Sequence, residues 1–192
     1  MIRLHRPGRG IAWAVLFAFL VCATAASAAK TAANEGEEDA VARCIHLAAN
    51  GKPWLEKTLW ALRDQEGGWV GAEIRNVDGS DDLGPLQINS WWVEKIAMLV
   101  HRSPRSVRWW LVHDACFNVE AARWIFLSGM AATHDFWTAI GIYHSPTRWR
   151  QQRYANGVAH HLTRRFGPQV FSRAHDRRLK PVPVAQVPTI QP

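Results

Sequence analysis

Three observations predict a single, mostly α-helical domain. Apolar residues recur at spacings of three and four, as on one face of a helix, most clearly at Leu55, Leu59 and Leu62. Residues that commonly end or begin helices separate such stretches, for example Asn50-Gly51 and Pro53. No convincing pair of strands occurs outside one Gly- and Asp-rich stretch, residues 71–87. With 192 residues and 48% hydrophobic content, the chain is long enough to build one core and is not of disordered composition.

The first 28 residues have the three parts of a secretory signal peptide. A basic start, an apolar run and a small-residue cleavage site are formed by Arg3, Arg6 and Arg9, by Ile11 to Val21, and by Ala26-Ser27-Ala28. The alternative is an uncleaved anchor, because the apolar run is almost long enough to span a bilayer. Cleavage would give an exported, periplasmic protein without a stable membrane anchor, and would lower the net charge from +7 to about +4.

The rest of the chain divides by composition. Residues 29–39 are polar and acidic and predict a flexible leader, residues 40–168 predict the folded domain, and residues 169–192 predict a basic and then Pro-rich tail. Within the domain we expect helices over residues 40–50, 53–66, about 92–100, 104–112, 114–126, 133–143 and 147–165. The proposed cap of the third of these is Asn89 or Ser90, whereas Ser103-Pro104 starts the fourth and Asp114 begins the fifth.

Without the signal peptide two cysteines remain, Cys44 and Cys116. An even count in an exported chain suggests a disulfide, which would close a loop of about 70 residues and add roughly 4 kcal/mol. Two buried free thiols are the alternative. No Cys/His cluster has metal-ligand spacing, and the neighbours His160 and His161 cannot share one helix face. We therefore expect neither a metal nor another cofactor.

Glu66 is the strongest candidate for chemistry. It continues the apolar stripe of the 53–66 helix, so its carboxyl group lies in line with the core face, and it stands at the C-terminal end of the helix, before Gly67-Gly68. The helix dipole and partial burial both disfavour a negative charge there and should raise the pKa of Glu66, as a general acid near neutral pH requires. The alternative is an ordinary surface glutamate at a frayed helix end.

Glu66 also opens a long polar stretch that ends at Trp92. This stretch carries three further acids, Asp78, Asp81 and Asp82, and Asp78-Gly79 favours a tight turn in it. A long stretch of this kind inside a compact domain is usually functional.

Four segments, in order, resemble the lytic transglycosylase (SLT) family of the lysozyme-like superfamily. They resemble its small exported branch, which accompanies conjugation, secretion and pilus systems. The segments are the helix from Pro53 to Glu66, NVDGSDDLGPLQINSWW, DACFNVEAARWIF and AIGIYHSPTRWRQQRYANGV. The resemblance covers about residues 41–158.

The resemblance implies a lysozyme-like helical domain with a short irregular loop region beside an active-site cleft. It implies a glycan-cleaving lyase that cuts the β-1,4 bond between N-acetylmuramic acid and N-acetylglucosamine in peptidoglycan and leaves a 1,6-anhydro product. Glu66 would be the catalytic residue, and Cys44 and Cys116 fall where this branch carries its disulfide. The partners implied are peptidoglycan glycan strands and a conjugation, secretion or pilus apparatus.

The resemblance also supplies the substrate-binding candidates, which are Gln87, Asn89, Tyr143, Trp69, Trp91 and Asp82. Tyr143 would hold Glu66 or the sugar, with a core tyrosine as the alternative. The side-chain amides of Gln87 and Asn89 would bind the loop or the N-acetyl groups of the sugar, and helix capping is the equal alternative for Asn89. The tryptophans would line the groove, because a flat indole face suits a sugar ring.

One departure from the family pattern and one further resemblance keep other functions open. The family usually has Ser after the catalytic Glu, whereas Gly67 stands here, which favours a catalytically weak peptidoglycan-binding assembly protein as one alternative. Asp82 also aligns with the second carboxylate of animal-type lysozymes, so a muramidase hydrolase is the other. If the protein is a transglycosylase, Asp82 only anchors the loop.

Arginines crowd the C-terminal third of the chain, including Arg148, Arg150 and Arg153. In an exported protein they indicate attraction to an anionic envelope polymer, or simply a solvated helix face. The signal peptide argues against nucleic acid as a partner.

Overall fold

Helix α2 (Pro53–Glu66) is the structural base of the site, and it has the bounds that the sequence predicted. The computed structural model describes residues 35–172, so the predicted signal peptide and most of the predicted tail lie outside the described residues. In α2 the predicted stripe is buried, with Leu55, Leu59 and Leu62 at most 2% exposed. The helix ends because Gly67 adopts a left-handed conformation at φ 61° and its N–H bonds to the Arg63 carbonyl.

The mostly α-helical class is confirmed. Residues 35–49 are helical, and the later helices are α3 (Trp92–Val100), α4 (Pro104–His113), α5 (Ala115–Thr133), α6 (Phe136–His144), α7 (Arg148–Phe166) and the short 3-10 helix η1 (Pro168–Phe171). Ser103 and Asp114 cap α4 and α5 by accepting from the backbone N–H of Ser106 and Phe117. No helix among residues 35–172 is long and apolar enough to cross a membrane.

Several predicted boundaries were wrong. Residues 35–39 belong to a helix instead of a flexible leader, because Glu37 accepts the Val70 backbone N–H and Glu38 pairs with Arg63. Helix α6 begins at Phe136, two to three residues later than expected, and Asp135 caps it. At the other end η1 packs on α7, so the folded part continues to Phe171, past the boundary at residue 168.

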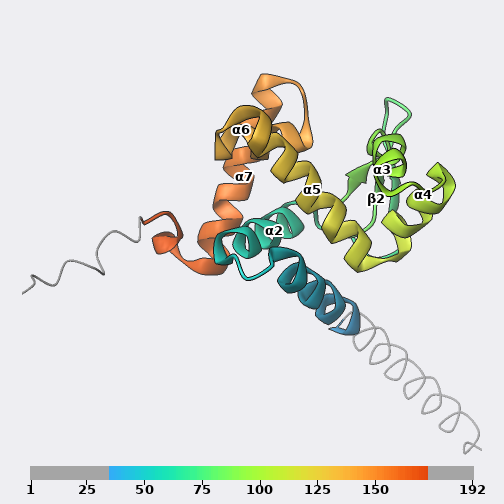
Figure 1. Cartoon of the computed structure of the whole chain (residues 1–192). Helices are drawn as coiled ribbons and strands as arrows, with labels where there is room; N and C mark the ends of the chain where they lie inside the picture. The colour runs from blue at the N-terminus through green and yellow to red at the C-terminus, as the bar shows by residue number, and fades with distance from the viewer. Residues whose placement is uncertain (1–34, 173–192) are drawn as a thin grey trace, which may run out of the picture.

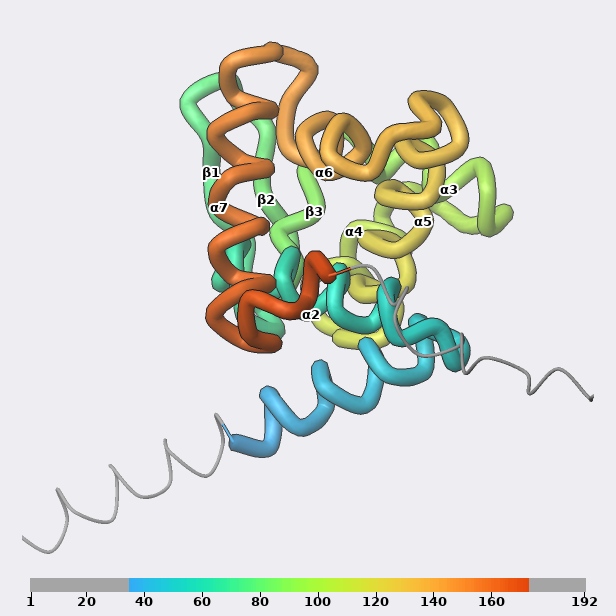
Figure 2. Tube along the Cα trace, turned by 90° about the vertical axis from the view of Figure 1, so that its left-hand side faces the viewer, coloured from blue at the N-terminus to red at the C-terminus, as the bar shows by residue number. Residues whose placement is uncertain are grey.

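A small antiparallel sheet in the order β1-β2-β3 fills the loop region, with strands β1 (Glu73–Arg75), β2 (Asp81–Leu83) and β3 (Ile88–Asn89). The Asp78-Gly79 turn joins β1 to β2 as a hairpin, as its sequence favoured. Helix α5 crosses the molecule from α4 to α6 and separates the sheet side from the α6–α7 side (Figure 1). In the view at right angles, α2 lies at the base of both (Figure 2).

Two links fix the helices around this base. The predicted disulfide joins Cys44 to Cys116 at the start of α5, with Cα atoms 4.8 Å apart. Arg165 of α7 donates two hydrogen bonds to Asp64 of α2, at 2.7 and 2.6 Å, and its guanidinium covers the Trp60 ring. These contacts hold α7 against the C-terminal half of α2, where Glu66 lies.

Candidate active site

The Glu66 carboxyl group receives a hydrogen bond from a tyrosine. The donor is the hydroxyl of Tyr154, which projects from α7 and is 5% exposed. Among the described residues Glu66 has no other hydrogen-bond partner, so one of its oxygens is held by the protein. Burial also raises the pKa of the Tyr154 phenol well above its usual value, so Tyr154 stays a neutral donor.

The surroundings of Glu66 favour its protonated form. Loss of solvation is the largest cause and raises its pKa from 4.5 to about 8. The Tyr154 hydrogen bond opposes this, and the negative charge of Asp82 adds to it. Glu66 is therefore mostly a neutral acid at pH 7, which is the property that its place on the apolar stripe predicted.

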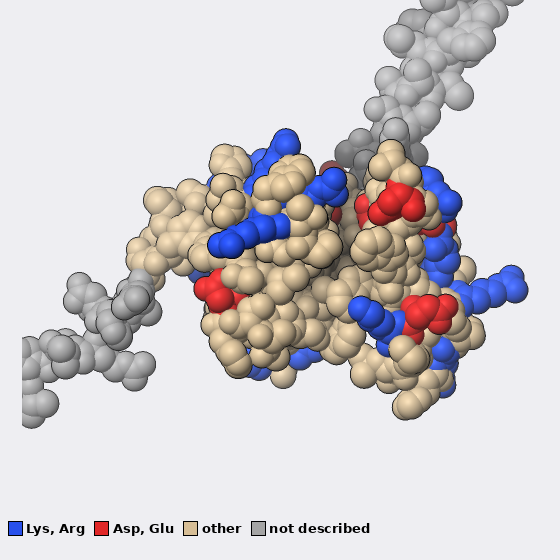
Figure 3. Space-filling view, turned by 90° about the horizontal axis from the view of Figure 1, so that it is seen from above, with Lys and Arg blue, Asp and Glu red and all other residues tan. Residues whose placement is uncertain are grey.

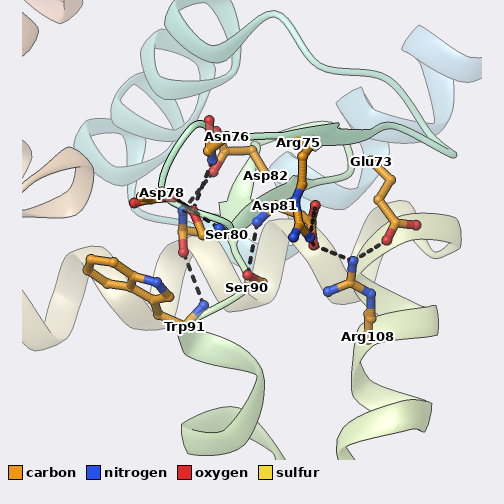
Figure 4. Close-up of polar contacts among 11 residues, drawn as sticks. Glu73, Arg75, Asn76, Asp78, Ser80, Asp81, Asp82, Ser90, Trp91 and Arg108 are labelled. Carbon is orange, nitrogen blue, oxygen red and sulfur yellow. Dashed lines mark hydrogen bonds and ion pairs between the residues drawn. The ribbon is translucent and has the colours of Figure 1, made fainter.

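The three acids of the polar stretch have separate roles. Asp78 accepts from the backbone N–H and the hydroxyl of Ser80, which hold the hairpin turn and lower the pKa of Asp78. Asp81 pairs with Arg108 and Arg75, whose hydrogen bonds lower its pKa (Figure 4). These two acids hold the loop together.

Asp82 is the acid of this stretch whose charge acts on Glu66. It lies on the central strand β2, and its charge acts on both Glu66 and Tyr143. Its carboxylate also accepts a 3.0 Å hydrogen bond from the Asn89 side chain, across the β2–β3 pair. Asp82 is thus both a loop contact and a second carboxylate within electrostatic reach of the first.

The two predicted amide residues are engaged in the loop itself. Asn89 donates to Ser80 and Asp82 and accepts the Trp91 backbone N–H, so its side chain is committed to the loop network. Neither Asn89 nor Ser90 caps α3, because Trp91 occupies the N-cap position without a side-chain bond. Gln87 donates to the Gly84 carbonyl at 2.8 Å.

Tyr143 does not hold Glu66, and that part of the prediction was wrong. Its hydroxyl donates to the Leu86 carbonyl at 3.0 Å, so it fixes the loop opposite the acid. Its ring lies roughly parallel to that of Tyr154, with centroids 6.3 Å apart, and the His144 ring stacks on the Tyr154 ring at 4.6 Å. The three rings form a packed group beside Glu66.

Sequence reasoning assigned no role to Tyr154 or Asn118, although both lay in segments that carried the resemblance. Asn118 of α5 is completely buried, and its side chain binds the Leu86 N–H, the Leu83 carbonyl and the Leu111 carbonyl at 2.8 to 2.9 Å. It approaches so closely that a Cβ at Gly84 would lie 2.5 Å from the Asn118 amide nitrogen. Asn118 therefore sets the position of the Gly84–Gln87 turn below the site.

The surface is hollowed between the α6–α7 side and the sheet side (Figure 3). Lysine and arginine lie on both sides of this groove. Arg148, Arg150 and Arg153 are exposed at the start of α7, and the charge of Arg150 makes a small contribution to the lowered pKa of Asp78. Trp69 and Trp91, the predicted groove tryptophans, are 51% and 64% exposed.

No protein-family model matches the sequence. Over 106 residues the chain is 32% identical to the protein named Invasion protein IagB from Salmonella typhi. The matched region is 52% of this chain and 62% of that protein, so the chain spans about three fifths of its relative's length.

Proposed function

We propose that this protein is an exported peptidoglycan lytic transglycosylase in which Glu66 is the acid and then the base. The observation that carries the proposal is the state of Glu66. Its carboxyl group has a pKa of about 8 and is held on one oxygen by a neutral phenol. The four ordered family-like segments support the same assignment.

The first step would be protonation of the bridging oxygen. Glu66 gives its proton to the oxygen between N-acetylmuramic acid and N-acetylglucosamine, and the bond from that oxygen to the muramic C1 breaks. The N-acetyl group of the muramic acid stabilises the cationic carbon. A carboxyl group that is protonated at neutral pH suits this step, because the enzyme then starts in the form that donates.

The second step would use Glu66 as a base. The carboxylate removes the proton of the muramic C6 hydroxyl, and that oxygen attacks C1 to give the 1,6-anhydro ring. The proton returns to Glu66, so the starting state is restored and water is not consumed. The Tyr154 hydrogen bond favours the charged form of Glu66, which stabilises the carboxylate between the two steps.

Exposed aromatic and basic side chains suit an anionic glycan strand. Trp69 and Trp91 expose indole faces on which sugar rings can stack. Arg148, Arg150 and Arg153 are exposed at the start of α7, and their positive charge would attract the carboxylates of peptidoglycan. We also propose that this cleavage opens the cell wall locally for a conjugation, secretion or pilus apparatus.

A muramidase hydrolase is the second candidate, and the position of Asp82 is the observation that favours it. The charge of Asp82 contributes to the raised pKa of Glu66. A retaining hydrolase requires such a second carboxylate, whereas a transglycosylase does not.

Digestion of purified murein separates these functions. We expect the wild-type protein to release anhydro-muropeptides, identified by mass, and Glu66→Gln to release none. The matched variant Asp82→Asn should still give anhydro products, because the mechanism does not need its charge. Products with reducing ends that disappear in Asp82→Asn would instead identify a hydrolase, and murein binding without release would identify a binding protein.

A further inference from the structure

An aromatic groove lies on the side of the molecule formed by α2, α6, α7 and η1. We define this aromatic groove by Trp54, Phe136, Trp137, Leu162, Val170 and Phe171. Its volume is about 520 Å³. Trp54, Trp137 and Phe171 are 47%, 38% and 49% exposed, so three large rings present open faces in one place.

The rings of the aromatic groove are held by the core. Phe136 packs edge-on against the buried Phe126 at 5.7 Å and against Trp137 at 4.9 Å. Trp137 in turn contacts Phe171 at 5.9 Å, and Trp54 contacts Phe126 at 6.4 Å. A rigid set of aromatic rings is the kind of surface that binds a Pro-rich segment in the polyproline II conformation.

The chain supplies such a segment next to the aromatic groove. Phe171 is part of its wall, and the described residues end at Ser172. Residues 173–180, RAHDRRLK, are followed by residues 181–192, PVPVAQVPTIQP, which contain four prolines and no charged residue. Eight connecting residues reach up to about 25 Å, so residues 181–192 can return to the aromatic groove.

The order of residues in this segment fits that conformation. Polyproline II has three residues per turn, so every third side chain lies on one edge. That edge would carry Pro181, Val184, Val187 and Ile190, which are all apolar, whereas another edge would carry Pro183, Gln186, Thr189 and Pro192. The first set forms an apolar stripe that matches an aromatic wall.

We propose that residues 181–192 bind in the aromatic groove of the same chain as a polyproline II segment, with Val184, Val187 and Ile190 against Trp54, Trp137 and Phe171. Attachment through Phe171 and the short connection gives the segment a high effective concentration, so weak contacts suffice. This inference does not depend on the proposed catalytic activity.

The test uses the full chain and the indole N–H signals of its tryptophans in NMR spectra, assigned by single Trp→Phe substitutions. The stripe variant Val184→Ser, Val187→Ser, Ile190→Ser should shift the Trp54 and Trp137 signals and leave those of Trp69 and Trp91 in place. The control Val182→Ser, Ala185→Ser changes the segment off the stripe and should shift none. Unchanged Trp54 and Trp137 signals in the stripe variant would overturn the proposal.

A synthetic peptide of residues 181–192, titrated into the stripe variant, provides a second test of the proposal. It should return the Trp54 and Trp137 signals toward their wild-type positions, and adding Trp137→Ala should weaken its binding at least tenfold. Failure of the peptide to bind would contradict the proposal. Signals that depend on protein concentration in the wild-type chain would contradict it too, because they would identify a second copy as the occupant.

Discussion

Single residues decide the chemistry of this site, and Glu66 with Tyr154 is the central pair. The hydrogen bond from Tyr154 stabilises the carboxylate and so lowers a pKa that loss of solvation raises. The measured pH dependence of activity should therefore respond to Tyr154, whereas Tyr143, which binds Leu86, should leave it unchanged.

For Tyr154→Phe we predict two changes in murein cleavage. The rate should fall about tenfold because the acid loses its fixed orientation. The alkaline limb of kcat/KM, expected near pH 8 in the wild type, should move to higher pH because the contact that lowers the pKa of Glu66 is gone. Tyr143→Phe is the control, and an equal displacement of the limb in both variants would refute the specific role of Tyr154.

Glu66 should also make the protein less stable as the pH rises. Its pKa is higher in the folded chain than in the unfolded chain, so its stabilising contribution is complete below pH 4.5 and is lost between pH 4.5 and about 8. Glu66→Gln lacks this loss and should gain about 3 kcal/mol over the wild type between pH 4.5 and 7. Urea unfolding at a series of pH values measures the difference, and a constant difference would contradict the raised pKa.

At the scale of elements, the end of α2 accounts for the departure from the family pattern at Gly67. Residue 67 has φ 61°, a conformation that favours glycine, and the position that a Cβ would occupy has no atom within 4 Å. The Cβ of a serine at this position would therefore contact no neighbouring residue. The glycine is explained by the left-handed conformation that ends the helix.

We predict that Gly67→Ser and the matched Gly67→Ala behave alike. Each should be about 1 kcal/mol less stable than the wild type, because a side chain is strained in the left-handed region. Their cleavage rates should agree within about twofold. A serine variant several times more active than the alanine variant would show that a hydroxyl at this position takes part in the reaction.

Helix α5 supports the site through Asn118. Its side chain joins three segments, and each lost bond leaves a buried polar group without a partner. We expect Asn118→Ala to lower the free energy of unfolding by about 2 to 4 kcal/mol and to reduce cleavage, because the Gly84–Gln87 turn moves. A variant with wild-type stability in urea would contradict this role.

Local signals explain which elements the sequence could predict. The stripe of α2, the helix starts at Ser103-Pro104 and Asp114, and the Asp78-Gly79 turn depend on neighbouring residues, and all three features are present. The predicted cap of α3 was wrong because the Asn89 side chain forms hydrogen bonds with Ser80, Asp82 and the Trp91 backbone instead. The strand pairing and the start of the first helix depend on contacts between distant segments.

At the scale of the whole molecule, the fold places side chains that are distant in the sequence next to one another. Glu66 was predictable because its helix stripe is local, whereas Tyr154 lies 88 residues away and reaches it only because α7 packs on α2. The disulfide was predictable from the two cysteines that remain after the predicted signal peptide. The effect of Asp82 on Glu66 could not be predicted, because it depends on how the sheet and α2 are placed relative to one another.

The central claim is that Glu66 cleaves the glycan without water. Digestion of murein in ¹⁸O-labelled water, followed by mass spectrometry of the released muropeptides, distinguishes the two reactions. We expect muramic ends that carry no ¹⁸O and lack one water relative to reducing ends, with no release by Glu66→Gln. Incorporation of ¹⁸O at new reducing ends would contradict it and would make Asp82 part of a hydrolase.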